Sequence, residues 1–268
     1  GWSMTKSVVN ALVGILVQMN LLHLEDTELL EEWSDENDPR RQITLDQLLR
    51  MSSGLEWEEV YAGLSDATRM LFASKSPAQL ALSKSLEFPT DTYWEYSSGT
   101  SNILSELVRR KIGGTNKQYW NFPHAFLFNK LGMRSAVMEP GPDGTFVGSS
   151  FMYATARDWA RFGLLYLNDG VWNGDRILPP GWVEYSQKAT PDAPRERYGA
   201  HFWLTRGEKG SHSDLPKDAY HMAGYEGQKV VIIPSYDLVI VRLGLSQPET
   251  NWDFTGFVMN VVNAFPDR

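Results

Sequence analysis

The most constraining feature of this 268-residue chain is an almost wholly apolar stretch at residues 7–22. Asn10, Gln18 and Asn20 interrupt it. The stretch is therefore too short and too polar to span a membrane, which takes about 20 mostly apolar residues. A helix that is apolar nearly all round is typical of the centre of a protein. The stretch predicts a buried helix around which the other elements pack.

A serine and a lysine, Ser3 and Lys6, stand where this predicted helix begins. Residues three apart on a helix are neighbours, about 5–6 Å between Cβ atoms. The positive end of the helix favours an alkoxide, and burial lowers the pKa of an amine. The pair can therefore form a nucleophile and its base without a histidine. Ser-x-x-Lys also arises by chance about once in a chain this long, so the alternative is an N-cap serine followed by a solvated lysine.

Composition removes several classes of function. The net charge is −8, and Lys and Arg cluster only at Arg40-Arg41 and at residues 109–111, which disfavours nucleic-acid binding. The chain has no cysteine, so disulfides, thiolate chemistry and cysteine-type zinc sites are excluded. The histidines show no metal-ligand spacing, and the acidic loop at 31–38 lacks the pattern of a calcium loop. We expect no cofactor. Composition does not decide between the cytosol and the cell envelope.

The order of predicted elements indicates an α+β fold. Helices are expected at residues 44–51, 64–84 with a break at Pro77, 99–111, 122–131, 155–169, 180–187 and 252–265. Strands are expected at residues 201–204, 230–233 and 238–241, the last two joined as a hairpin. Helices followed by a hairpin favour an antiparallel sheet flanked by helices.

Two further short segments carry side chains or backbone that suit hydrolysis. Tyr96 lies in a loop just before a predicted helix, and its hydroxyl could relay a proton if a neighbouring ammonium lowers its pKa. The glycine-rich segment 224–228 leads into a strand, where exposed N–H groups could stabilise an oxyanion. The alternatives are a structural tyrosine and an ordinary turn.

Taken in this order, the three segments resemble the β-lactamase-like, penicillin-recognising serine hydrolases, of which Ser-x-x-Lys is a signature. The similarity is greatest to class C β-lactamases, carboxylesterases and 6-aminohexanoate-oligomer hydrolases, and extends to residues 48–55, 154–163 and 178–183. The resemblance implies a single catalytic domain over 1–268. Its mostly helical part would be 23–190. The nucleophile helix and the sheet would be 1–22 and 191–268.

The resemblance also assigns roles residue by residue. Ser3 would be the acylated nucleophile, Lys6 its proton partner and Tyr96 the second member of the acid/base pair. The backbone N–H groups of Ser3 and Gln228 would form the oxyanion hole, and Tyr61 would face the substrate. The residues around these positions that would also contact substrate are Ser98, Tyr225, Glu226 and Gly227.

Two departures from the family pattern bear on the substrate. Ser98 stands where β-lactamases usually carry asparagine, and Tyr225-Glu226-Gly227 stands where they carry Lys-Thr-Gly. A glutamate would repel the substrate carboxylate that the lysine normally holds. We therefore expect a small neutral ester, or a linear amide carrying an amine terminus. The alternatives are a β-lactamase or D,D-peptidase, and a catalytically inactive homologue that acts as a binding or scaffold protein.

Two segments around the predicted site carry further expectations. In the resembled family, strands that precede the nucleophile complete the central sheet, and an uncovered sheet edge is an aggregation hazard. We expect an associated N-terminal fragment, another chain, or a preceding segment that the sequence omits to cover this edge. Residues 206–217, rich in charge and glycine, are expected to form part of the pocket rim and to influence specificity.

Overall fold

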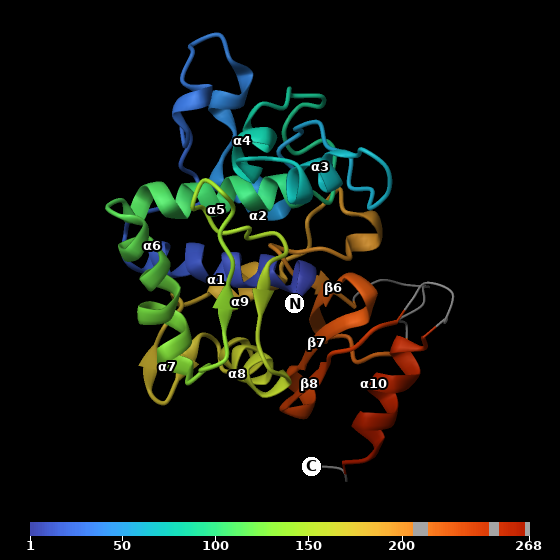
Figure 1. Ribbon diagram of the computed structural model, residues 1–268. Helices are drawn as coiled ribbons and strands as arrows, with labels where there is room; N and C mark the ends of the chain where they lie inside the picture. The colour runs from blue at the N-terminus through green and yellow to red at the C-terminus, as the bar shows by residue number, and fades with distance from the viewer. Residues whose placement is uncertain (206–213, 247–251, 266–268) are drawn as a thin grey trace.

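The computed structural model of the protein describes residues 1–205, 214–246 and 252–265. Helix α1 (Thr5–Gln18) runs through the middle of the molecule, and α5 (Ser98–Ile112) packs alongside it (Figure 1). Every α1 side chain from Thr5 to Leu16 is buried, which confirms the prediction of a central apolar helix. Among the described residues, no helix is both long and apolar enough to cross a bilayer.

Most of the regular elements between α1 and the main sheet are helices. The other α-helices of this part are α2 (Leu45–Arg50), α3 (Asp66–Phe72), α4 (Pro77–Leu82), α6 (Asn116–Pro123), α7 (Asn129–Leu131), α8 (Ala156–Leu167) and α9 (Trp182–Gln187). A π-helical turn, η4 (His124–Phe128), joins α6 to α7. Two small antiparallel hairpins interrupt the helices: β1 (Val137–Met138) with β2 (Met152–Tyr153), and β3 (Val171–Trp172) with β4 (Asp175–Arg176).

The main sheet is antiparallel and four-stranded, in the order β5 (Trp203–Leu204), β6 (Tyr220–Gly224), β7 (Gln228–Ile233) and β8 (Leu238–Arg242). Alternate residues of β7 enter two cores: Val230 and Ile232 join the main core, whereas Val231 and Ile233 pack with α10 (Phe254–Asn263). On the first of these faces α8 lies so close that a Cβ on Gly163 would stand 2.6 Å from the Val239 side chain. The predicted α+β fold, with helices flanking an antiparallel sheet, is confirmed.

Several element boundaries follow their predicted signals. Thr44 and Gln47 form the reciprocal capping box expected at the start of α2, and Pro77 begins α4. Helix α2 ends one residue early because Met51 adopts a left-handed conformation, with φ of 61°. The Val230 and Leu238 strands form the predicted hairpin.

Two predictions of local structure were wrong in their bounds, and one strand was not predicted. The predicted strand 201–204 is regular only at Trp203–Leu204, because His201 has φ of 61°. The helix expected at 122–131 begins earlier, since Thr115 and Gln118 form a capping box that starts α6 at Asn116. Strand β6 was missed, because its sequence contains no β-branched residue.

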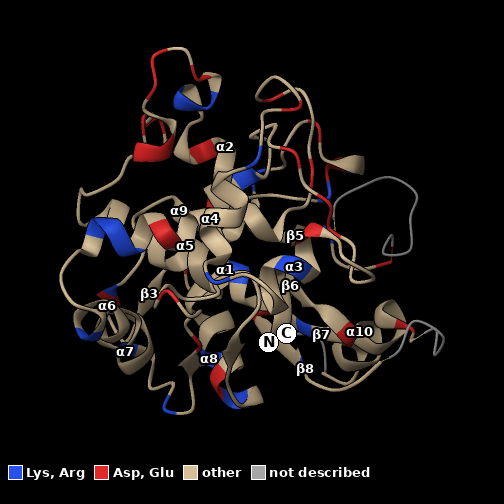
Figure 2. Cartoon of the chain, turned by 45° about the horizontal axis from the view of Figure 1, so that its top comes forward, with Lys and Arg blue, Asp and Glu red and all other residues tan. Residues whose placement is uncertain are grey.

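Strand β8 forms an edge of the sheet within the described part of the chain, where it pairs with β7 alone. An additional strand along this edge stays a prediction. Of the segment predicted to line the pocket rim, residues 206–213 lie outside the described residues. Figure 2 shows Lys and Arg spread over many elements rather than gathered along one helix or strand, which fits the acidic net charge of −8.

Candidate active site

Ser3 and Lys6 meet at the start of the central helix. Ser3 is half-buried in a single 3₁₀ turn, η1 (Trp2–Met4), which runs directly into α1. Lys6 lies in the first turn of α1 with 1% of its surface exposed. Its Nζ stands 3.0 Å from the Ser3 Oγ. The structure therefore brings together the hydroxyl and the amine that the helical spacing placed on one face.

The Lys6 amine has three acceptors. Besides the Ser3 Oγ, it donates to the Ser98 Oγ at 2.9 Å and to the Ser149 carbonyl oxygen at 3.0 Å. Burial lowers the pKa of Lys6 to about 8, while the nearby Glu59 carboxylate acts in the opposite direction. An appreciable fraction of the amine is therefore neutral near physiological pH. A neutral amine can accept the proton of the Ser3 hydroxyl.

Tyr96 lies beside the pair, as predicted, but its protonation differs from the expectation. The Lys6 Nζ stands 4.9 Å above the Tyr96 ring, and the Tyr96 hydroxyl hydrogen-bonds with Ser3. Burial, the largest influence, raises the pKa of Tyr96 well above its ordinary value, and the contact with Ser3 only partly offsets this. The prediction that a neighbouring ammonium lowers this pKa was wrong. Tyr96 is a phenol at neutral pH and can donate a proton.

Ser98 was expected to contact the substrate, but its side chain lies in the interior of the protein. It is fully buried behind Lys6, at the start of α5, whose N-cap is the Ser97 side chain. Its hydroxyl donates to Glu59 Oε1 at 2.5 Å and accepts from Lys6. Ser98 thus joins a lysine to a carboxylate inside the protein.

Glu59 is the site residue that the sequence analysis missed. Its carboxylate hydrogen-bonds with Ser98, which lies 39 residues further along the chain, so no local spacing connects the two residues. The available signal was the Trp57-Glu59-Tyr61 alternation, in which the side chains of both aromatic residues donate to Glu59, Trp57 Nε1 at 2.6 Å and Tyr61 OH at 2.9 Å. Trp57 can approach α5 because residue 99 is glycine: a Cβ there would stand 2.5 Å from its ring.

Three aromatic rings lie next to the nucleophile. Tyr61 and Tyr225 stack with their centroids 5.4 Å apart, and Trp2 packs edge-on against both. Burial raises the pKa of Tyr61, so it stays a phenol that donates to Glu59. Tyr225 is 42% exposed. The predicted position of Tyr61 beside the site agrees with its hydrogen bond to Ser3, and its role toward a substrate stays a prediction.

The glycine-rich segment approaches the nucleophile turn through Gly224, the last residue of β6. A Cβ on Gly224 would lie 2.2 Å from the Gly1 carbonyl oxygen, so this close approach requires glycine. Gln228 pairs with Gly224 across the hairpin, and its side chain bonds the backbone of Gly244. The segment therefore borders Ser3, whereas the assignment of an oxyanion donor to Gln228 stays a prediction.

Arg242 holds the turn Tyr225–Gly227 in place. Its guanidinium donates to the Gly227 carbonyl at 2.9 Å and to the Ser246 Oγ at 2.6 Å. The Glu226 backbone has φ of 60°, and its carbonyl oxygen accepts from the Ser246 N–H at 2.9 Å. Because its Nη1 group is engaged by carbonyls of the turn and its Nη2 group donates to Ser246, Arg242 is poorly placed to replace the missing lysine as a carboxylate receptor.

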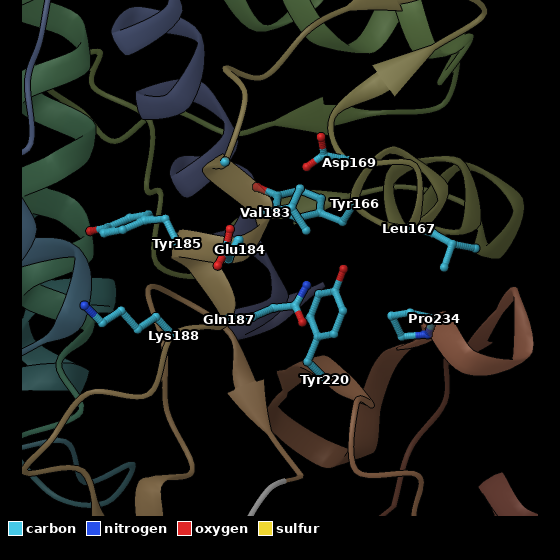
Figure 3. A pocket seen from close by; sticks show the side chains of 11 residues that line it. Tyr166, Leu167, Asp169, Val183, Glu184, Tyr185, Gln187, Lys188, Tyr220 and Pro234 are labelled. Atoms are coloured by element: carbon cyan, nitrogen blue, oxygen red, sulfur yellow. The ribbon is translucent and has the colours of Figure 1, made fainter.

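A separate groove lies between α8, α9 and the start of β6 (Figure 3). It has a volume of about 690 Å³, and Tyr166, Val183, Tyr185 and Tyr220 are among its lining residues. None of the predicted site residues lines it. The described residues also contain no group of three His, Cys, Asp or Glu that could hold a metal ion. Ser3, Lys6 and Tyr96 gather instead at the N-terminal end of α1.

The sequence profile of the β-lactamase family matches residues 1–253. The chain belongs to the β-lactamase family. Over 162 residues, 56% of this chain and 38% of the relative, it is 30% identical to 6-aminohexanoate-dimer hydrolase of Paenarthrobacter ureafaciens. The chain spans 38% and 53% of the lengths of two curated relatives that it matches.

Solved structures of β-lactamase-family proteins share the fold. A Bacillus anthracis protein provisionally named 6-aminohexanoate-dimer hydrolase aligns with a TM-score of 0.79 at 22% identity, over 99% of this chain and 73% of that one. EstCE1, a hydrolase with promiscuous acyltransferase activity, aligns with a TM-score of 0.73 at 15% identity, over 98% of this chain and 83% of that one. The predicted resemblance to the β-lactamase family and the predicted fold are confirmed.

Proposed function

We propose that the protein forms an acyl-enzyme on Ser3 and hydrolyses small carboxylic esters or linear amides. The observation that carries this proposal is the buried Lys6 amine, 3.0 Å from the Ser3 Oγ, with its pKa lowered to about 8. A serine hydroxyl is a weak nucleophile until an adjacent base accepts its proton. The two atoms have the separation that such a transfer requires.

In the first half of the reaction, neutral Lys6 accepts the Ser3 proton while the Ser3 Oγ bonds the substrate carbonyl carbon. In this proposal the backbone N–H groups of Ser3 and Gln228 stabilise the oxyanion, and one such donor contributes about 2.7–4 kcal/mol. The bond to the leaving group then breaks. The departing alcohol or amine takes one proton from the Lys6–Tyr96 pair, in which Tyr96 is the phenol donor.

In the second half, a water molecule hydrolyses the ester between the acyl group and Ser3. It loses a proton to the same pair, its oxygen bonds the acyl carbon, and the ester to Ser3 breaks as the Ser3 oxygen regains a proton. The whole cycle consumes one water and releases one carboxylic acid and one alcohol or amine. Ser3, Lys6 and Tyr96 return to their starting protonation states, so these residues suffice for the cycle.

The substrate we propose is a neutral ester or an amide with an amine terminus. Glu226 stands on the turn beside the nucleophile, and Arg242 is engaged by that turn's backbone. A substrate carboxylate would therefore meet negative charge there. The similarity to a 6-aminohexanoate-dimer hydrolase supports an amide, and the fold shared with EstCE1 is compatible with an ester.

Changing Glu226 to lysine is expected to raise the rate on nitrocefin relative to p-nitrophenyl butyrate by about 10-fold, because an opposite charge beside a carboxylate is worth about 1 kcal/mol or more near a protein surface. Glu226→Gln should change the same ratio in the same direction and by less. The matched control is Glu184→Lys, an exposed position on α9 away from Ser3. Equal ratios in wild type and both Glu226 variants would remove the substrate argument.

Penicillin recognition is the second candidate function, favoured by the family match and by the shared fold of a penicillin-binding protein from Bacillus halodurans, with a TM-score of 0.71. A panel of p-nitrophenyl butyrate, a linear amide and nitrocefin separates the candidates when it is run on wild type and Ser3→Ala. Our proposal predicts turnover of the ester or the amide above nitrocefin. Dominant nitrocefin turnover would favour the second candidate, and no turnover together with no covalent labelling would favour an inactive scaffold.

A further inference from the structure

We propose that Glu59 is a positioning residue that orients the Lys6 amine for proton transfer by fixing the Ser98 hydroxyl between them. This inference rests on the proposed function, since it concerns how the same base is prepared. Ser3, Lys6 and Tyr96 describe the reacting groups, and none of them explains why a carboxylate stands behind the lysine.

Each carboxylate oxygen of Glu59 accepts two hydrogen bonds. Oε1 accepts from the Ser98 Oγ at 2.5 Å and from the Tyr61 hydroxyl at 2.9 Å. Oε2 accepts from the Ser98 backbone N–H at 2.8 Å and from Trp57 Nε1 at 2.6 Å. An ionised carboxylate can only accept, so all four groups must point their protons toward Glu59. The single proton of the Ser98 hydroxyl is thereby committed.

That commitment dictates how the Lys6 amine is held. Because the Ser98 hydroxyl gives its proton to Glu59, its oxygen can only accept from Lys6, as it does at 2.9 Å. The Ser149 carbonyl oxygen accepts a second Lys6 proton at 3.0 Å. When the amine is neutral, two N–H bonds point to these oxygens and the lone pair is left facing Ser3. Without Glu59, the Ser98 hydroxyl could instead donate to the Lys6 lone pair and block it.

Glu59 also supplies the charge that acts on Lys6. The other titratable groups facing the amine are uncharged at neutral pH. Burial raises the pKa of Tyr96 and of Tyr61, and burial followed by the lysine charge lowers the pKa of His201, whose Nδ1 lies against the Lys6 carbonyl, to about 3. The negative charge of Glu59 raises the pKa of Lys6 and so opposes the effect of burial.

Replacing Glu59 with glutamine therefore has two expected effects. The pKa of Lys6 falls, so the ascending limb of kcat/KM against pH moves down by about one pH unit, as expected when an opposite charge at close range is removed. The plateau of kcat/KM also falls by about 100-fold, because the carboxamide nitrogen cannot accept the Ser98 N–H and the hydroxyl loses its fixed orientation.

Three further variants separate charge from orientation. Glu95→Gln is the matched control. Glu95 is half-buried near Glu59, and burial followed by Glu87 and Glu59 raises its pKa to about 7, but its side chain makes no hydrogen bond to Ser98. It should leave the limb and the plateau unchanged. Ser98→Ala and Glu59→Asp keep a carboxylate at position 59 but lose the Ser98 hydroxyl or its fixed orientation between Glu59 and Lys6. Each variant should therefore lower the plateau of kcat/KM and keep the ascending limb at its wild-type pH.

The experiment measures kcat/KM for p-nitrophenyl butyrate from about pH 5 to about pH 10 in all five proteins. It also follows the Lys6 side-chain nitrogen by NMR titration, which needs no turnover. Two results together support the proposal. The limb and the NMR midpoint fall in Glu59→Gln and stay in the other variants, and the plateau falls in Glu59→Gln, Glu59→Asp and Ser98→Ala but not in Glu95→Gln.

An unchanged plateau in Glu59→Gln, or the same fall of the plateau in Glu95→Gln, would overturn it. If Glu59→Gln does not fold, the comparison of Ser98→Ala and Glu59→Asp with wild type decides, since an unchanged plateau in both contradicts a positioning role. If wild type hydrolyses neither ester nor amide, the proposed function fails, while the NMR titration still tests the action of Glu59 on Lys6.

Discussion

Replacing Ser3 with alanine is expected to lower kcat/KM for p-nitrophenyl butyrate on the order of 10⁴-fold or more, because no acyl-enzyme can form without the Oγ. The change removes a half-buried hydroxyl from a short turn ahead of α1 and leaves the buried core untouched. The fold should therefore persist, which circular dichroism and urea unfolding would show.

A matched serine on the adjoining helix α1 controls for the loss of a hydroxyl. Ser7 donates to the His201 carbonyl at 2.6 Å and makes no hydrogen bond to the Lys6 amine. Ser7→Ala is expected to lose some stability, about 1 kcal/mol or more for the unpaired carbonyl, and to keep its activity. Ester hydrolysis that survives in Ser3→Ala at the wild-type rate would mean that another group performs the chemistry.

Replacing Lys6 with methionine is the second large expected effect, a loss of about 10³-fold in kcat/KM. Methionine resembles the aliphatic part of lysine in length and flexibility, so its side chain can fill the buried space that Lys6 occupies. It removes the base and leaves the Ser98 and Ser149 oxygens without their donor. The residual activity should also lose the ascending limb near pH 8 that the wild type owes to Lys6.

Lys6→Met also has a predicted consequence for stability. The pKa of Lys6 is lowered from 10.5 to about 8 on folding, so between these values the unfolded chain binds more protons than the folded one. The free energy of unfolding of wild type should then rise with pH across this window, by a total on the order of 3 kcal/mol from this group. Below about pH 8 the full penalty of burying the ammonium remains.

The measurement is urea unfolding of both proteins between about pH 7 and pH 10.5. The stability of wild type relative to Lys6→Met should increase across the range, since the methionine cannot titrate. A difference between the two proteins that stays constant with pH would contradict the lowered pKa of Lys6.

The parts of the site that sequence could predict are those that depend on local spacing. Ser3 and Lys6 are three apart at the start of an apolar helix, so helical geometry alone places them together. Thr44 and Gln47 form a capping box by the same kind of short-range rule. The hairpin from Val230 to Val241 follows from β-branched runs separated by a turn.

The parts that sequence could not predict depend on contacts across the fold. Glu59 meets Ser98 only because α5 packs beside the loop that carries Trp57, and Gly99 admits the Trp57 ring. The pKa of Tyr96 was predicted from one expected neighbour, whereas burial from all sides decides it. Protonation states of buried groups therefore required the assembled structure.

The central claim is that Ser3 is the residue that carries the acyl group. The most direct test is to react wild type and Ser3→Ala with a fluorophosphonate, digest both proteins, and locate the adduct by mass spectrometry. We predict one adduct, on the peptide that contains Ser3, and none in Ser3→Ala. An adduct on another residue, or ester turnover by a wild type that takes up no label, would contradict the account.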